Sequence, residues 1–142
     1  MGVSRIFWDS NLFIYFFEGS DARSAATKQL RQNMLDRGDQ LFTSTLTVGE
    51  ILVKPAAKGD HARCRLYEEA LGKTSIILPF DLKTARRYAT IRGTASIKGP
   101  DAIQLACAAE AGIDLFVTND NHLKGRRVDG IQFIVGLDQV PL

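Results

Sequence analysis

Short apolar runs that alternate with longer helix-like segments constrain this chain most. The apolar runs predict strands at residues 5–8, 41–43, 75–78, 115–117 and 131–135. The segments between them predict helices at residues 12–17, 22–37, 47–53, 60–71, 81–92 and 100–111. Strands that alternate with helices are typical of an α/β fold. We therefore expect a mainly parallel central sheet of four to five strands, flanked by helices.

Local signals mark several helix ends. Asp21 is suited to capping a helix N-terminus, and Gly38 stands where a C-terminal glycine belongs. Pro100 suits the first position of a helix, because its fixed φ matches the helical value there. Pro55 and Gly72 are expected to end the two helices that precede them.

Length and composition indicate one globular domain spanning residues 1–142. Hydrophobic residues make up 45% of the chain and charged residues 24%, which is too apolar for a disordered chain. No apolar run reaches the roughly 20 residues of a membrane helix, and no signal peptide is evident, so we expect a cytoplasmic protein. Cys64 and Cys107 have neither disulfide-framework nor zinc spacing. The net charge of +2 leaves nucleic-acid binding open.

Four acids stand at the ends of predicted elements. Asp9 directly follows the first strand and Asp120 follows the fourth, while Glu50 and Asp101 stand near the starts of helices. In parallel sheets, ligands bind beyond the carboxyl ends of the strands. We therefore expect these four carboxylates to meet at one edge of the sheet.

Each acid also has a simple structural interpretation. Asp9 could cap a helix, Thr47 and Glu50 could form a capping box, Asp101 could complement a helix dipole, and Asp120 could form an Asx-turn. Taken together, four clustered carboxylates cannot all stay ionised without compensation, because like charges raise one another's pKa. A divalent cation with oxygen ligands, Mg²⁺ or Mn²⁺, is the usual compensation.

The segments that carry these acids resemble a known family. FWDSNLFIYFFEG, TSTLTVGEIL, PDAIQLACAA and FVTNDNHL, in this order, look like PIN-domain ribonucleases, and most like the VapC-type toxins of type II toxin–antitoxin pairs. The resemblance implies a single PIN-like nuclease domain. It also implies that Asp9, Glu50, Asp101 and Asp120 hold one or two Mg²⁺ or Mn²⁺ ions, Glu50 either directly or through a water. Asn119 and Asn121 flank Asp120, so which of these three faces the metal stays open.

The resemblance further implies supporting residues and a reaction. Asn11, Thr118 and Ser10 would hold the carboxylates in place. The reaction would be metal-assisted hydrolysis of an RNA phosphodiester, leaving a 5′ phosphate and a 3′ hydroxyl. No protein nucleophile is required, which makes Ser10 a supporting residue.

RNA beside an acidic site requires nearby cations. Lys98, Arg87 and Lys54 are the first candidates for phosphate contacts, although each is also explained as a solvated surface charge. Further basic residues close to the acids in sequence are Lys58, Arg86, Arg92, Lys124, Arg126 and Arg127.

The apolar run LFIYFF at residues 12–17 predicts a partner surface. A helix that is apolar all round cannot bury every face against its own sheet. Leu12, Tyr15, Phe16 and Phe17 are therefore candidates for a groove, unless the next helix covers them fully. The resemblance implies a small antitoxin protein in such a groove, and a homodimer.

Three alternatives stay open. A non-catalytic RNA-binding or interaction module would need no metal, but the sequence lacks the aromatic strips of common RNA-binding modules. A Mg²⁺-dependent phosphoryl-transfer domain would need a second acid close to Asp9, and none occurs before Glu18. A housekeeping PIN nuclease would keep the site and lack the antitoxin. The RNA target is not readable from the sequence.

Overall fold

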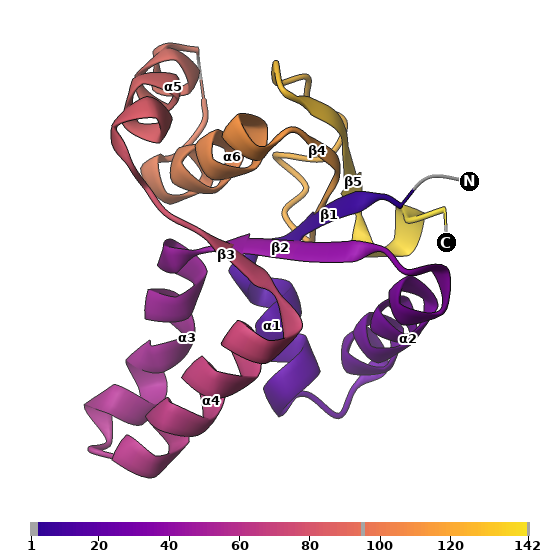
Figure 1. The fold of residues 1–142 in the computed structure, drawn as a ribbon, viewed down its shortest axis with the longest axis vertical. Helices are drawn as coiled ribbons and strands as arrows, with labels where there is room; N and C mark the ends of the chain where they lie inside the picture. The colour runs from indigo at the N-terminus through magenta and orange to yellow at the C-terminus, as the bar shows by residue number, and fades with distance from the viewer. Residues whose placement is uncertain (1–2, 95, 142) are drawn as a thin grey trace.

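A five-stranded parallel sheet forms the centre of the molecule (Figure 1). The computed structural model describes residues 3–94 and 96–141. The strands are β1 (Arg5–Trp8), β2 (Gln40–Ser44), β3 (Ile76–Leu78), β4 (Ile113–Thr118) and β5 (Ile131–Gly136). Their order is β3-β2-β1-β4-β5, and every neighbouring pair is parallel. The predicted α/β fold class is confirmed, and all five predicted strands are present.

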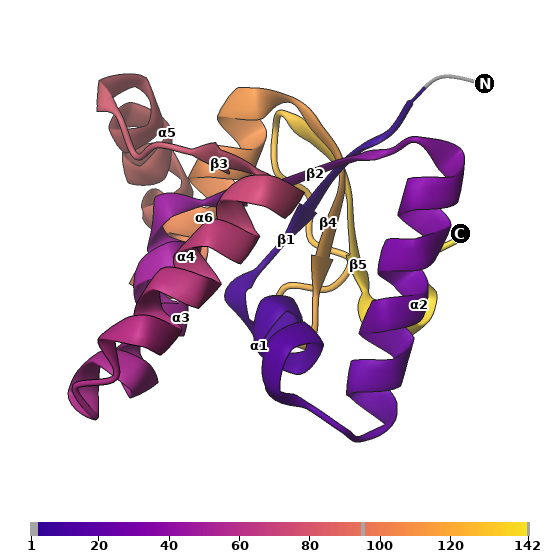
Figure 2. The same cartoon turned by 60° about the horizontal axis from the view of Figure 1, so that its bottom comes forward.

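Helices cover both faces of the sheet. They are α1 (Ser10–Glu18), α2 (Ala22–Arg37), α3 (Thr45–Ala57), α4 (His61–Thr74), α5 (Leu82–Gly93) and α6 (Gly99–Ala111). Helices α1 to α4 lie on one side, and α5 and α6 lie on the other (Figure 1). Figure 2 shows the loop that joins α1 to α2 at the bottom of the view. A short 3₁₀ turn, Leu137–Gln139, follows β5 and was not predicted.

Alternating side chains of β1 divide the core into two clusters. Phe7 points toward α5 and α6 and stacks on Phe116 of β4, with ring centroids 4.9 Å apart. Ile6 and Trp8 point the other way, into the cluster formed with α1 to α4. Both faces of the central strand are thus buried, as expected for a parallel sheet covered by helices.

Capping explains why several predicted helix boundaries are correct. Asp21 accepts a hydrogen bond from the Ser24 backbone N–H at the start of α2. Gly38 ends this helix with φ of 76°, a left-handed conformation that favours glycine. Gly112 ends α6 in the same way, with φ of 67°.

Two predicted helix ends are wrong. Helix α3 continues through Pro55 to Ala57, and α4 continues through Gly72 to Thr74. Pro55 lies in the last turn of α3 and its side chain is buried, so packing offsets the one hydrogen bond that proline cannot donate. Gly72 follows Leu71, which is fully buried and anchors the last turn of α4. Tertiary packing thus overrides both local stop signals.

The apolar helix α1 is more deeply buried than predicted. Leu12 is completely buried in the core, so its prediction as a partner-groove residue is wrong. The reason is that α1 lies directly over Trp8, whose ring is 5.2 Å from that of Phe13. Phe16 and Phe17 stay half-buried at the edge of this cluster.

In the described part of the chain, no helix combines the length and the apolar character needed to cross a membrane. Cys64 and Cys107 are both free thiols.

Candidate functional site

The adjacent ends of β1 and β4 bring two polar residues together. Trp8 lies beside Val117 in the parallel ladder, so the residues that follow, Asp9 and Thr118, are neighbours. Thr118 is buried, and its hydroxyl donates a hydrogen bond of 2.5 Å to Oδ2 of Asp9. The same hydroxyl accepts a 3.0 Å hydrogen bond from the Asp120 backbone N–H. Thr118 thus connects the acid after β1 to the acid after β4.

Asp9 is a buried carboxylate. Only 8% of it is exposed, and burial raises its pKa to about 6. The hydrogen bond from Thr118 opposes this rise, and the negative charge of Asp101 adds to it. Asp9 also caps α1, because Oδ1 accepts a 3.2 Å hydrogen bond from the Asn11 backbone N–H. Asp9 therefore caps α1, as its simple structural interpretation predicted, and is also one of the four acids.

Asp101 lies at the centre of the four acids. Burial raises the pKa of its carboxyl group, and the negative charge of Asp120 and a side-chain hydrogen bond with it raise the pKa further. Glu50 acts in the same direction, while the positive charge of Lys98 lowers the pKa. The structure therefore brings the four acids, which come from four separate elements, within electrostatic reach of one another.

Glu50 is exposed and held from α1. Its Oε1 accepts a 2.8 Å hydrogen bond from the Ser10 hydroxyl. Asn11 contacts the site through its backbone N–H, which donates a hydrogen bond to Asp9. Asn11 itself is exposed.

Among the three polar residues after β4, Asp120 is the one that interacts with Asp101. Asn119 instead donates from Nδ2 to the Tyr15 hydroxyl at 3.0 Å, and Asn121 is exposed. Asp120 also makes the Asx-turn that the sequence suggested, because Oδ1 accepts from the His122 backbone N–H at 2.8 Å. Asp120 is thus both the turn residue and a member of the acid cluster.

A buried polar network beneath the acids was missed in the sequence. Gln104 accepts from the Ser44 hydroxyl at 2.5 Å and donates from Nε2 to the Thr47 hydroxyl at 2.8 Å. Gln104 is 4% exposed, and both hydroxyl residues are fully buried. The detectable signal was a lone glutamine within an otherwise apolar stretch of α6.

This network also corrects the expected capping box. Ser44, and not Thr47, is the N-cap of α3, since its hydroxyl accepts the Thr47 backbone N–H at 3.4 Å. The Thr47 hydroxyl instead accepts a hydrogen bond from Gln104, so Thr47 is not the N-cap that a capping box with Glu50 requires. The network joins α3, which carries Glu50, to α6, which carries Asp101.

The three first candidates for phosphate contacts lie in different places. Lys98 precedes α6 and acts electrostatically on Asp101, so it lies beside the acids. Lys54 lies about one turn beyond Glu50, at a hollow beside Phe17. Arg87 binds Glu110 at 2.6 Å, and this glutamate is about 13 Å along α6 from Asp101. Arg87 is therefore remote from the acid cluster.

The donor set fits a hard divalent cation in type and charge. It consists of carboxylate oxygens, the ligands that Mg²⁺ and Mn²⁺ prefer, and a cation would relieve the repulsion that raises the pKa values of Asp9 and Asp101. Over residues 3–94 and 96–141, however, no three His, Cys, Asp or Glu side chains are gathered closely enough to form a ready metal site.

A family model that matches most of the sequence identifies the family of this chain. The PIN domain family model matches residues 6–129, from β1 to the loop before β5. The chain belongs to the PIN domain family. PIN domains are nucleases, and they generally use divalent metal ions. The resemblance inferred from the four acidic segments is thereby confirmed. No curated protein matches this PIN domain chain.

Solved structures with the same fold come from toxin–antitoxin systems. A chain of a toxin–antitoxin complex from Klebsiella pneumoniae is 25% identical, with 89% of this chain and 94% of that chain covered and a TM-score of 0.66. A chain of DNA-bound VapBC from Salmonella typhimurium is 18% identical and has a TM-score of 0.72. The match covers 95% of this chain and 99% of that chain. A chain of FitAcB from Neisseria gonorrhoeae is 22% identical and has a TM-score of 0.62. The match covers 81% of this chain and 87% of that chain.

Proposed function

We propose that this PIN domain protein is a divalent-metal-dependent endoribonuclease and the toxin of a type II toxin–antitoxin pair, acting in the cytoplasm. The observation that carries the proposal is the mutual influence of the four acids at the carboxyl ends of β1 and β4. Asp101 raises the pKa of Asp9, and Asp120 and Glu50 raise the pKa of Asp101. Repulsion between these carboxylates disfavours their ionised forms, and a bound cation would remove this effect.

The acids would hold one or two Mg²⁺ or Mn²⁺ ions through Asp9, Asp101 and Asp120, with Glu50 acting directly or through a water. Such an ion supplies an activated water and stabilises negative charge on a phosphodiester. Thr118 holds Asp9 in place and Ser10 holds Glu50.

Lys98 supplies a cation beside the acids. Its charge acts on Asp101, so it is placed to contact an RNA phosphate that approaches this carboxylate. The products would be a 5′ phosphate and a 3′ hydroxyl, because a water would attack the phosphorus and the 3′ oxygen would leave.

Regulation by an antitoxin is the second part of the proposal. It is supported by the 25% identical chain of a toxin–antitoxin complex and by a hollow of about 590 Å³ beside α1. Phe17 lines this hollow and stacks on Tyr67, with ring centroids 5.3 Å apart. We propose that an antitoxin segment binds there and that the protein forms a homodimer. Phe17→Asp should prevent copurification with a cognate antitoxin.

Cleavage of total RNA by the purified protein tests the nuclease. We expect discrete cleavage with Mg²⁺ or Mn²⁺ that stops with chelator, and losses greater than about 100-fold in Asp9→Asn and Asp101→Asn. Glu68→Gln, an exposed acid on α4, is the matched control and should cleave normally. Metal-independent cleavage, or full activity in Asp101→Asn, would contradict the proposal. A folded protein that binds RNA without cleaving it would favour a binding module.

A further inference from the structure

A second hollow, on the α5–α6 side of the sheet, is separate from the acid cluster. It has a volume of about 720 Å³ and lies between these helices and residues 126–129. We call it the basic cavity, after the cations that line it: Lys83, Arg86, Arg87, Arg126 and Arg127. Only two acids, Glu110 and Asp129, are among its lining residues. The excess of positive charge at this one place is larger than the net +2 of the whole chain.

The structure shows which of these charges are already neutralised. Arg87 is bound to Glu110 at 2.6 Å and to the backbone oxygen of Asp129 at 3.1 Å. Arg86 and Arg127 are exposed and, within the described part of the chain, their side chains form no salt bridge or hydrogen bond. These two guanidinium groups therefore keep their full capacity to bind an anion.

The cavity is not only charged. Ile91 and Ile97, which are buried, and Val128, which is half-buried, supply apolar surface. The volume lies within the range of roughly 300 to 1,000 Å³ that is usual for small-ligand sites. A ligand that combines an anionic group with a flat, weakly polar ring satisfies both kinds of surface, and a nucleotide has this composition.

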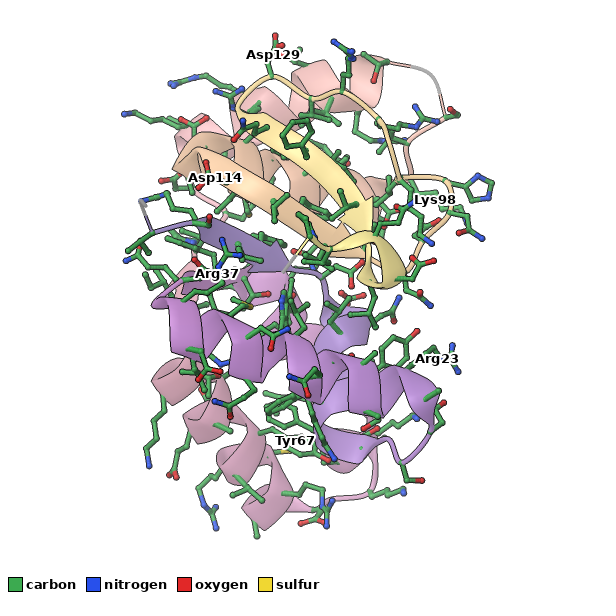
Figure 3. All side chains as sticks on the ribbon, turned by 90° about the vertical axis from the view of Figure 1, so that its right-hand side faces the viewer. Arg23, Arg37, Tyr67, Lys98, Asp114 and Asp129 are labelled. Carbon is green, nitrogen blue, oxygen red and sulfur yellow. The ribbon has the colours of Figure 1, made fainter. Side chains whose placement is uncertain are left out.

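The basic cavity adjoins the acid cluster at one end. Ile97 lines the cavity and directly precedes Lys98, whose charge acts on Asp101. Arg126 also lines it and donates from Nε to the backbone oxygen of His122, two residues beyond Asp120. Figure 3 shows Lys98 and Asp129 well apart on this half of the molecule, so the cavity extends away from the acids.

We propose that the basic cavity binds a nucleotide of single-stranded RNA that flanks the cleaved phosphodiester, with Arg86 and Arg127 contacting its phosphates. The inference rests on the proposed ribonuclease function and adds to it a site that selects and orients the strand. It accounts for a nuclease whose catalytic groups are all acidic, because the strand is held by cations that lie outside the acid cluster.

Binding without cleavage tests this site. Fluorescence anisotropy of a short labelled single-stranded RNA is measured in chelator, so that the outcome is independent of catalysis. We expect the Kd of Arg86→Ala/Arg127→Ala to rise about tenfold at low salt. The slope of log K against log salt should become shallower by about 1.4, because each lost phosphate contact on a single strand contributes about 0.7. Arg65→Ala, an exposed arginine on α4 without a salt bridge, is the matched control.

Small competitors distinguish a nucleotide site from a phosphate site. Adenosine monophosphate should displace the RNA more effectively than inorganic phosphate, because only the former contacts the apolar surface. An equal loss of RNA binding per removed charge in Arg65→Ala and in the double variant would overturn the proposal, since it would indicate non-specific attraction. Unchanged RNA binding in the double variant would also overturn it, and would leave the cations available to an acidic protein segment.

The two proposals fail in different ways. RNA cleavage that is unaffected by the double variant would remove the basic cavity and leave the ribonuclease intact. Selective RNA binding through Arg86 and Arg127, in a protein that cleaves no RNA with any divalent metal, would keep the cavity and remove the ribonuclease.

Discussion

Thr118 shows how much one residue organises this site. Its hydroxyl donates to the Asp9 carboxylate and accepts from the Asp120 backbone N–H, so it fixes both acids at the ends of β1 and β4. Because the residue is fully buried, water cannot replace its hydrogen bonds. The position of two acids therefore depends on a side chain that does not itself carry a charge.

Thr118→Val should lower metal affinity or RNA cleavage by roughly 10- to 100-fold, the usual effect of losing a group that holds a ligand. The shape of the side chain is preserved, so the loss reports the hydroxyl. Thr118→Ser restores the hydroxyl and should recover most of the activity. Equal activity in the valine and serine variants would show that the hydroxyl has no role.

The raised pKa of Asp9 predicts a pH-dependent stability in metal-free protein. The folded-state pKa of about 6 lies above the ordinary 3.8, so the folded state binds this proton more tightly than the unfolded state. The ionised carboxylate therefore destabilises the fold fully above pH 6, and this effect disappears as the pH falls toward 4. The shift corresponds to about 3 kcal/mol.

Asp9→Asn removes the ionisable group and keeps a good helix cap. In chelator we expect the variant to be more stable than the natural protein at pH 8, and the difference to shrink toward pH 4. Urea unfolding at several pH values measures it. A difference that does not vary with pH would show that Asp9 does not titrate in this range.

At the scale of elements, the site depends on the connection between α3 and α6. Gln104 joins the two helices through Ser44 and Thr47, directly below the acids that these helices carry. The other buried residues of α6 are apolar, and apolar contacts are not directional. The buried polar network supplies the specific geometry between the helices.

Gln104→Leu should destabilise the protein by about 2 kcal/mol or more, because it leaves two buried hydroxyls without their partner. RNA cleavage should fall as well, since Glu50 and Asp101 lose their relative position. Urea unfolding and cleavage rates report the two effects. Gln29→Leu, on the exposed surface of α2, is the control and should change neither.

At the scale of the whole molecule, charge is divided between neighbouring regions. Four acids that act on one another lie at the ends of β1 and β4 and at the starts of α3 and α6, whereas five cations line the basic cavity beside α5 and α6. A net charge of +2 conceals this division. The proposed metal site and the proposed anion-binding cavity would together suit a polyanionic substrate.

Metal binding should be visible in the stability of the whole domain. At a Mn²⁺ concentration about 100 times the Kd, ligand linkage adds roughly 2.7 kcal/mol, which for a domain of this size raises Tm by roughly 8 °C. Asp101→Asn should lose most of this increase, whereas Glu68→Gln should retain it. An equal increase in all three proteins would place the metal elsewhere.

The sequence predicted the α/β class, all five strands, all six helices and the resemblance to the PIN domain family. These features depend on local periodicity, capping and residue order, which a single chain displays directly. The sequence placed Asp9, Glu50, Asp101 and Asp120 near one edge of the sheet, and the four acids do act on one another electrostatically. Their role as metal ligands stays a prediction.

Tertiary structure alone decided the rest. Helix α3 passes Pro55 because the proline is buried in its last turn, and Leu12 belongs to the core because α1 lies over Trp8. Arg87 lies far from the acids because it binds Glu110, which is about two and a half turns along α6 from Asp101. The Gln104 network and the basic cavity join segments distant in sequence. Such contacts depend on how helices pack on the sheet, and no local pattern encodes that geometry.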